Sequence, residues 1–126
     1  PAKTYRNLEE FGHAVATVAE AHRRDFKFRP EQLAPIERAL RKLKQRGVKV
    51  AIIYFPVSGL IETINDIRYP KQIWEEATSH LSANIVDYRD YPQLKLKLVD
   101  GSHLDKRQKS EFSRRLAEIL IEQGVL

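Results

Sequence analysis

Hydrophobic residues recur at three- and four-residue steps in several parts of the chain, which is the spacing of one face of an α-helix. The pattern predicts helices over residues 7–22, 30–46, 70–83 and 104–123. Pro30 and Pro70 stand at the start of the second and third stretches, where a first helical turn tolerates proline. Gly47 and Gly124 follow the second and fourth stretches, a place where glycine commonly ends a helix.

Two shorter stretches have the character of strands. Residues 48–55 are almost wholly apolar beyond Lys49, which indicates a strand buried on both faces, as in a parallel sheet covered by helices. Residues 84–88 form a second, shorter strand. Residues 94–99 alternate as an edge strand would, yet they equally suit an extended loop. We expect residues 56–69 to form a loop that contains at most a short helical turn.

Strands that alternate with helices predict an α/β fold with parallel strands. We expect one domain over residues 1–126, in which helices flank the sheet on both faces to give three layers. Residues 48–55 look like a central strand, which needs a neighbour on each side, whereas only one other strand is clear. We therefore expect an incomplete sheet that a second copy of the chain, or the remainder of a longer parent chain, completes.

Composition narrows the class of protein. The chain has 126 residues, 42% of them hydrophobic and 31% charged, which suits one soluble globular domain. No apolar run reaches the length of about 18 residues that a membrane-spanning helix needs. The absence of cysteine excludes disulfides, thiolate metal sites and cysteine nucleophiles. The absence of methionine, even at the start, favours an excised piece of a longer protein.

The net charge of +5 is unevenly distributed. Residues 1–50 carry 12 Lys and Arg against 6 Asp and Glu, whereas residues 51–126 carry 10 against 11. A basic half can bind nucleic acid or an anionic surface. Such charges are more often the solvated faces of helices, so the charge alone does not decide between the two interpretations.

An acid and an imidazole stand three positions apart, at Asp100 and His103, just before the last predicted helix. Histidine is the most common general base near neutral pH, and a carboxylate can orient it and stabilise the imidazolium. Gly101 would permit a tight turn between them. Alternatively, Asp100 and Gly101 are a simple turn, and Ser102 caps the helix in a Ser-x-x-Asp pattern with Asp105.

From Gly47 to the end, the order of parts resembles the C-terminal portion of an SGNH (GDSL-type) hydrolase domain. The parts are "KQRGVKV", an apolar strand closing on proline ("AIIYFPV"), a helix, a short strand ending in Asp ("NIVDY"), then "DGSHL" and an amphipathic helix. In that family the catalytic Asp and His lie before the last helix as D-x-x-H. The resemblance therefore implies that Asp100 is the acid and His103 the base.

The similarity is greatest to the envelope acyl-transfer branch, such as alginate acetylation proteins and the D-alanine transfer protein of lipoteichoic acid. The resemblance implies ester hydrolysis or acyl transfer on an acylated polysaccharide or another cell-surface polymer. It also implies a location in the bacterial cell envelope or periplasm.

The chain departs from the family at the nucleophile. No Gly-Asp-Ser motif occurs, and Thr63 stands where the glycine of the oxyanion motif Gly-x-Asn-Asp would precede Asn65 and Asp66. Ser58, in "FPVSGL", is the candidate nucleophile within the chain, because it follows the strand at its carboxyl end; the alternative is an ordinary loop residue. We therefore expect the isolated chain to be inactive, with the nucleophile elsewhere in a parent protein.

The sequence indicates no cofactor and no metal, since it has neither a glycine-rich phosphate loop nor histidines at metal-ligand spacing. Tyr88, Arg89 and Tyr91 interleave aromatic and basic groups as nucleic-acid surfaces do, but Asp87 and Asp90 flank them and would repel phosphate. This argues against nucleic acid at that segment. The competing hypothesis for the whole chain is a non-catalytic, small, basic α/β module that binds a protein partner or nucleic acid.

Overall fold

The computed structural model describes residues 6–7, 9–14, 17, 30–98 and 101–126. Its elements in chain order are the 3-10 helix η1 (Pro30–Leu33), α2 (Ala34–Gln45), β1 (Ala51–Tyr54), α3 (Gly59–Arg68), α4 (Lys71–Thr78), β2 (Asn84–Asp87), the 3-10 helices η2 (Tyr88–Asp90) and η3 (Pro92–Leu94), and α5 (Lys109–Glu122). Half of the predicted first helix lies outside the described residues, and residues 9–14 and 17 are helical.

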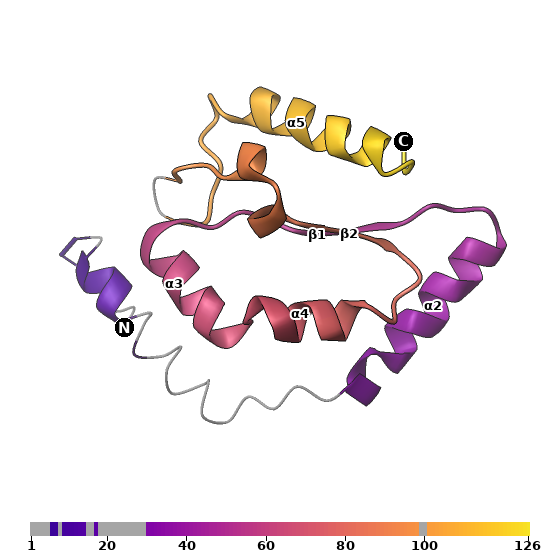
Figure 1. The fold of residues 1–126 in the computed structure, drawn as a ribbon. Helices are drawn as coiled ribbons and strands as arrows, with labels where there is room; N and C mark the ends of the chain where they lie inside the picture. Colours follow the sequence, from indigo (N-terminus) through magenta and orange to yellow (C-terminus); the bar gives the residue numbers. More distant parts are fainter. Residues whose placement is uncertain (1–5, 8, 15–16, 18–29, 99–100) are drawn as a thin grey trace.

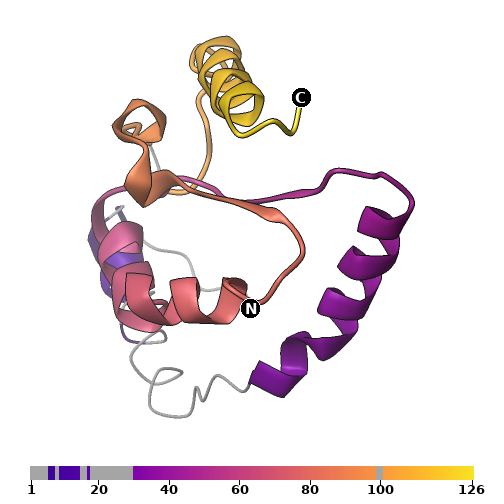
Figure 2. The same ribbon diagram turned by 45° about the vertical axis from the view of Figure 1, so that its right-hand side comes forward.

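The two strands are parallel, with Ala51 opposite Asn84 and Tyr54 opposite Asp87. Helix α5 lies on one side of them, and α3 and α4 lie on the other (Figure 1). Helix α2 stands to the side of this stack, as the turned view in Figure 2 also shows. The predicted α/β fold with parallel strands is confirmed, in the form of a small two-stranded sheet.

The core lies between the sheet and α5. Its buried side chains are Val86, Tyr88, Leu94, Phe112 and Ile119. Phe112 and Ile119 are seven positions apart, so two helical turns present both on the inner face of α5. Burial of this apolar area is the main stabilising contribution to the docking of α5.

Helix α3 is a correction to the sequence analysis, which expected a loop over residues 56–69. Pro56 and Gly59 suggested irregular chain, but both precede or begin the helix rather than interrupt it. Behind them, Ile61, Ile64 and Ile67 recur at three-residue steps, and Ile64 is buried. This helical pattern was therefore present and hidden by the proline and glycine in front of it.

Helix α5 begins at Lys109, five residues later than predicted from the hydrophobic spacing. The residue before it is Gln108, so Ser102 does not cap this helix and the capping interpretation of Ser102 is wrong. Instead, the Asp105 carboxylate accepts hydrogen bonds from the Arg107 backbone N–H (2.8 Å) and from its guanidinium (2.9 Å). These bonds from Arg107 hold the pKa of Asp105 well below its usual range, and they stabilise a turn that competes with the first helical turn.

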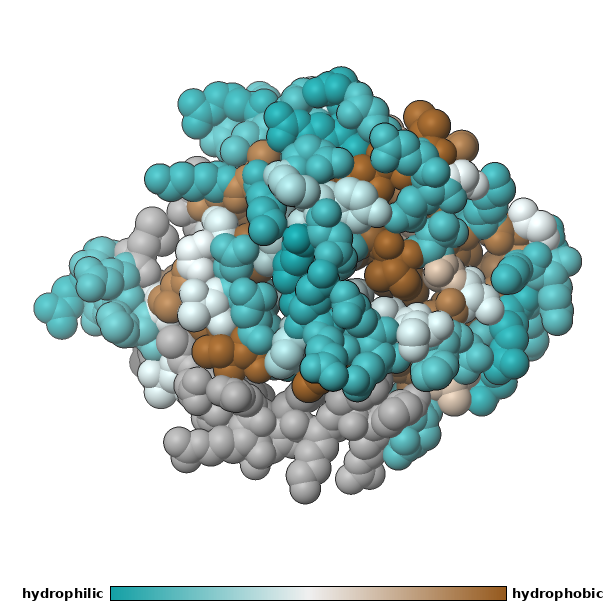
Figure 3. Space-filling model, in the orientation of Figure 1, coloured by the Kyte–Doolittle hydropathy of each residue, from teal (hydrophilic) through white to brown (hydrophobic). Residues whose placement is uncertain are grey.

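Strand β1 pairs only with β2 among the described residues. Residues 95–98 are extended chain outside both strands, so the edge-strand alternative for residues 94–99 is wrong over the part that is described. Beside β1, a hollow of about 280 Å³ opens between α2 and α4, lined by apolar side chains that include Ile36, Ile52 and Trp74. Hydrophobic side chains accordingly reach the surface among hydrophilic ones in Figure 3.

We expect the chain to self-associate, because an open strand edge and an apolar hollow next to it both favour pairing with another chain. Sedimentation velocity over a concentration series should show a sedimentation coefficient that rises with concentration. Ile36→Asp should weaken this association, because Ile36 is 47% exposed beside the hollow. The matched control is Ile121→Asp on α5, where an isoleucine is 60% exposed. A monomer at every concentration, or equal effects of the two substitutions, would contradict the prediction.

No helix in the described part of the chain is long and apolar enough to cross a membrane.

Candidate functional site

Ser58 connects the segment after β1 to the turn before α5. Its backbone N–H donates a hydrogen bond of 2.9 Å to the carbonyl oxygen of Gly101. Its Oγ accepts one of 2.9 Å from the Leu98 backbone N–H, and lies 3.4 Å from the Leu98 carbonyl oxygen, to which it donates. The structure thus brings together two segments that the sequence analysis singled out separately, one around Ser58 and one around residues 100–103.

Gly101 is required at the centre of this contact. It is buried and has a φ of 82°, a backbone conformation that favours glycine. A Cβ atom on residue 101 would lie 2.8 Å from the Ser58 carbonyl oxygen and 3.2 Å from the side chain of Ile61. Any larger residue would therefore push the turn away from the end of β1.

His103 follows in the same turn and is exposed to solvent. Its Nδ1 lies 3.1 Å from the Ser102 hydroxyl, and the tautomer of the ring decides which of the two atoms donates. Asp100, the predicted acid, lies outside the described residues. Because Leu98 and Gly101 both bond to Ser58, which follows β1, the turn that carries His103 lies near the edge of the sheet at which both parallel strands end.

Ser58, the candidate nucleophile within the chain, has its Oγ engaged with both polar backbone atoms of Leu98. Through these bonds the hydroxyl of Ser58 stabilises the turn. The role of Ser58 as nucleophile stays a prediction. Thr63 and Asn65, the positions compared with the family's oxyanion motif, both lie on α3.

A buried ion pair at the same edge of the sheet was missed by the sequence analysis. Asp87 ends β2, and its side chain is 3% exposed; that of Arg89 is 10% exposed. The Arg89 Nε donates to both carboxylate oxygens, at 2.9 and 3.0 Å, and Nη2 lies 2.5 Å from Oδ2. The Arg89 backbone N–H also donates to Asp87 Oδ1, at 2.9 Å.

The guanidinium of Arg89 has further partners. Nη1 donates a hydrogen bond of 2.9 Å to the carbonyl oxygen of Tyr69. The guanidinium carbon lies 4.9 Å from the centre of the Tyr54 ring, a cation–π contact. Burial by itself would lower the pKa of Arg89, but the hydrogen bonds to Asp87 and the charges of Asp87 and Asp66 together outweigh burial and raise it. Arg89 is therefore a cation held inside the fold, and it does not contribute to an exposed nucleic-acid surface.

Two tyrosines lie next to this pair, of which Tyr88 is buried and Tyr54 is half-buried. Tyr88 donates a hydrogen bond of 3.4 Å to Glu62, and the rings of Tyr54 and Tyr88 meet edge to face at 5.5 Å. Burial raises the pKa of both phenols above the usual tyrosine value. The only signal in the sequence for the buried ion pair was Asp87 at the end of an apolar strand, with Arg89 two positions later.

Within the described residues, no group of three or more His, Asp or Glu side chains could hold a metal ion. Comparison with protein-family models, curated proteins and solved structures found no match. Any proposal of function therefore rests on the chemistry of the residues and on their geometry.

Proposed function

We propose that this chain is the acid/base-bearing part of an SGNH-like ester hydrolase or acyltransferase. His103 is the general base, Asp100 is its orienting acid, and the nucleophilic serine lies outside residues 1–126. The observation that supports the proposal is the hydrogen bonding of Leu98 and Gly101 to Ser58. An exposed imidazole next to that attachment lies near the carboxyl ends of parallel strands, the edge at which α/β proteins build their sites.

The proposed reaction has two steps. In the first, His103 takes the proton of the serine hydroxyl while the serine oxygen attacks the ester carbonyl, and then gives it to the departing alkoxide. In the second, His103 takes a proton from water or from an acceptor hydroxyl, which attacks the acyl-serine, and returns it to the serine oxygen. Asp100 orients the ring and stabilises the imidazolium. The substrate class in this proposal is an acylated polysaccharide or another cell-surface polymer, in the bacterial envelope.

A fluorophosphonate probe tests the serine directly, because it forms a phosphorus–oxygen bond with a serine whose proton a base removes, and releases fluoride. In the longer protein that contains this chain, we expect labelling of one serine outside residues 1–126, located by peptide mass spectrometry. His103→Ala should reduce the labelling rate at least about a hundred-fold, as loss of a general base does. His80→Ala, which removes another exposed histidine, should leave the rate unchanged.

Three results would contradict the proposal. They are labelling of Ser58, labelling that is insensitive to His103→Ala, and no labelled serine in the longer protein.

A further inference from the structure

The end of α2 and the segment after it form the most basic stretch of the described chain. Between residues 38 and 49 the sequence has six Lys and Arg and no Asp or Glu. Only Arg41 among these six makes an ion pair with a described residue, Glu37, at 3.1 Å. Four of the five arginines of residues 51–126 differ, since Arg89, Arg107, Arg114 and Arg115 pair with carboxylates.

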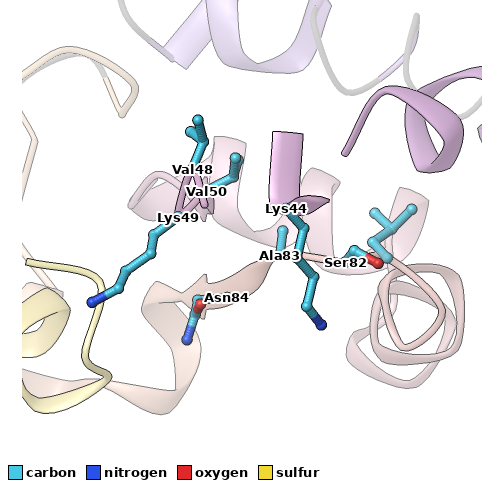
Figure 4. Close-up of a pocket in the computed structure, with 8 residues that line it drawn as sticks. Lys44, Val48, Lys49, Val50, Ser82, Ala83 and Asn84 are labelled. Carbon is cyan, nitrogen blue, oxygen red and sulfur yellow. The ribbon is translucent and has the colours of Figure 1, made fainter. Parts of the chain in front are cut away.

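Two of these unpaired cations line a pocket. It has a volume of about 260 Å³ and lies where the chain enters both strands, with Lys44 and Lys49 on one segment and Ser82 and Asn84 on the other. Figure 4 shows the ammonium groups of Lys44 and Lys49 on either side of Asn84, and they do not converge on one point. Both lysines are exposed. The pocket therefore offers two separated positive charges with hydrogen-bonding groups beside them.

The pocket lies at the amino ends of the strands, whereas His103 belongs to the carboxyl ends. Asn84 begins β2 and Val50 immediately precedes β1, so the four residues of each strand separate the two places. A ligand in the pocket would thus not be the group that reacts at His103. The inference that follows does not rest on the proposed hydrolase function.

We propose that this pocket binds an extended ligand that carries two or more phosphate groups. Lysine ammonium groups act as compact point charges that suit phosphate oxygens, whereas planar carboxylates are better matched by the fork of arginine. The separation of Lys44 from Lys49 fits two phosphates rather than one. The unpaired neighbours Lys42 and Arg46 add to the positive field that attracts such a ligand.

One effect opposes the proposal. The carboxyl end of a helix carries about half a negative charge, which repels anions. The last carbonyl oxygens of α2 are engaged, since those of Leu43 and Lys44 accept hydrogen bonds from the backbone N–H groups of residues 46–48. Four unpaired full charges on residues 42–49 outweigh the remaining partial charge, so the net field at the pocket is positive.

Tripolyphosphate is the probe that tests the site. Titration into the ¹⁵N-labelled chain at about 50 mM salt, where screening is weak, should shift the amide signals of residues 48–50 and 82–84. Lys44→Gln with Lys49→Gln should weaken binding about ten-fold or more, since each substitution removes a charge-assisted contact. Ser82→Ala keeps every charge and should weaken binding a few-fold.

The matched control is Lys95→Gln with Lys97→Gln, which removes the same charge from two exposed lysines away from the pocket. It should change affinity less than about two-fold. Equal weakening by the two double variants would mean that a solvated basic face attracts anions without a site, and would overturn the proposal. Citrate that binds as tightly as tripolyphosphate would overturn the phosphate assignment, and so would shifts confined to residues outside the pocket.

Discussion

Asp87→Asn is expected to lower the free energy of unfolding by about 3 kcal/mol or more, the usual result of removing one partner from a buried ion pair. The substitution keeps the shape of the side chain but removes the buried countercharge of the Arg89 guanidinium, which is 10% exposed. The remaining countercharge is Asp66, 3.6 Å from Nη1 and 53% exposed, so solvent weakens its interaction with Arg89. The carbonyl of Tyr69 and the ring of Tyr54 also remain as partners, and both are uncharged. Urea denaturation followed by circular dichroism measures the change.

Two further variants make this result interpretable. Asp90→Asn removes a carboxylate three positions away whose ion pair with Lys71 is exposed, so it should cost less than about 1 kcal/mol. Asp87→Asn combined with Arg89→Met removes both charges and should recover part of the lost stability, because no charge is left buried. Equal effects of Asp87→Asn and Asp90→Asn on the free energy of unfolding would show that the buried ion pair contributes no more to stability than the exposed one.

The ion pair between Asp87 and Arg89 could not be predicted from the sequence. Apolar runs correctly predicted two parallel strands, and the three- and four-residue spacing of apolar residues predicted the helix that covers them. They do not report that the chain turns back after β2 so that Arg89, two residues later, reaches the carboxylate of Asp87. From the sequence alone, a charged residue next to a strand is expected to be solvated, and only the tertiary fold shows whether it is buried.

The candidate site was predictable in its parts and not in its assembly. Ser58 was chosen from its position after a strand, whereas Asp100 and His103 were chosen from their spacing and the family resemblance, and the roles of all three stay predictions. The contact of Ser58 with Leu98 and Gly101 joins residues about 40 positions apart, so it depends on how the strands pair and not on any local pattern. The predicted start of α5 was wrong for the opposite reason. Local hydrogen bonds between Asp105 and Arg107 form a turn there, and the spacing of hydrophobic residues cannot show such a turn.

The proposed general base gives the largest expected effect on activity. In the proposed longer protein, His103→Ala should lower kcat/KM for an aryl acetate at least about a thousand-fold, because the proposed serine nucleophile would lose the group that removes its proton. Asp100→Asn should also lower kcat/KM by a large factor, although less than His103→Ala does, because the imidazole keeps its place and loses its orienting charge. His80→Ala removes an exposed histidine elsewhere and should have no effect. The circular dichroism spectrum and thermal unfolding of each variant should match those of the unchanged protein, since His103 is exposed to solvent.

Ser58→Ala separates the proposal from its nearest competitor. If Ser58 only braces the turn, its loss removes the hydrogen bonds to Leu98 and reduces kcat/KM moderately, in proportion to a shift of His103. If Ser58 is the nucleophile, its loss should be as severe as that of His103, and the isolated 126 residues should hydrolyse the ester. We expect no hydrolysis by the isolated chain, because the hydroxyl that His103 activates is absent from it. Full activity of His103→Ala in the longer protein would remove the chemical basis of the hydrolase proposal and leave the turn with a purely structural role.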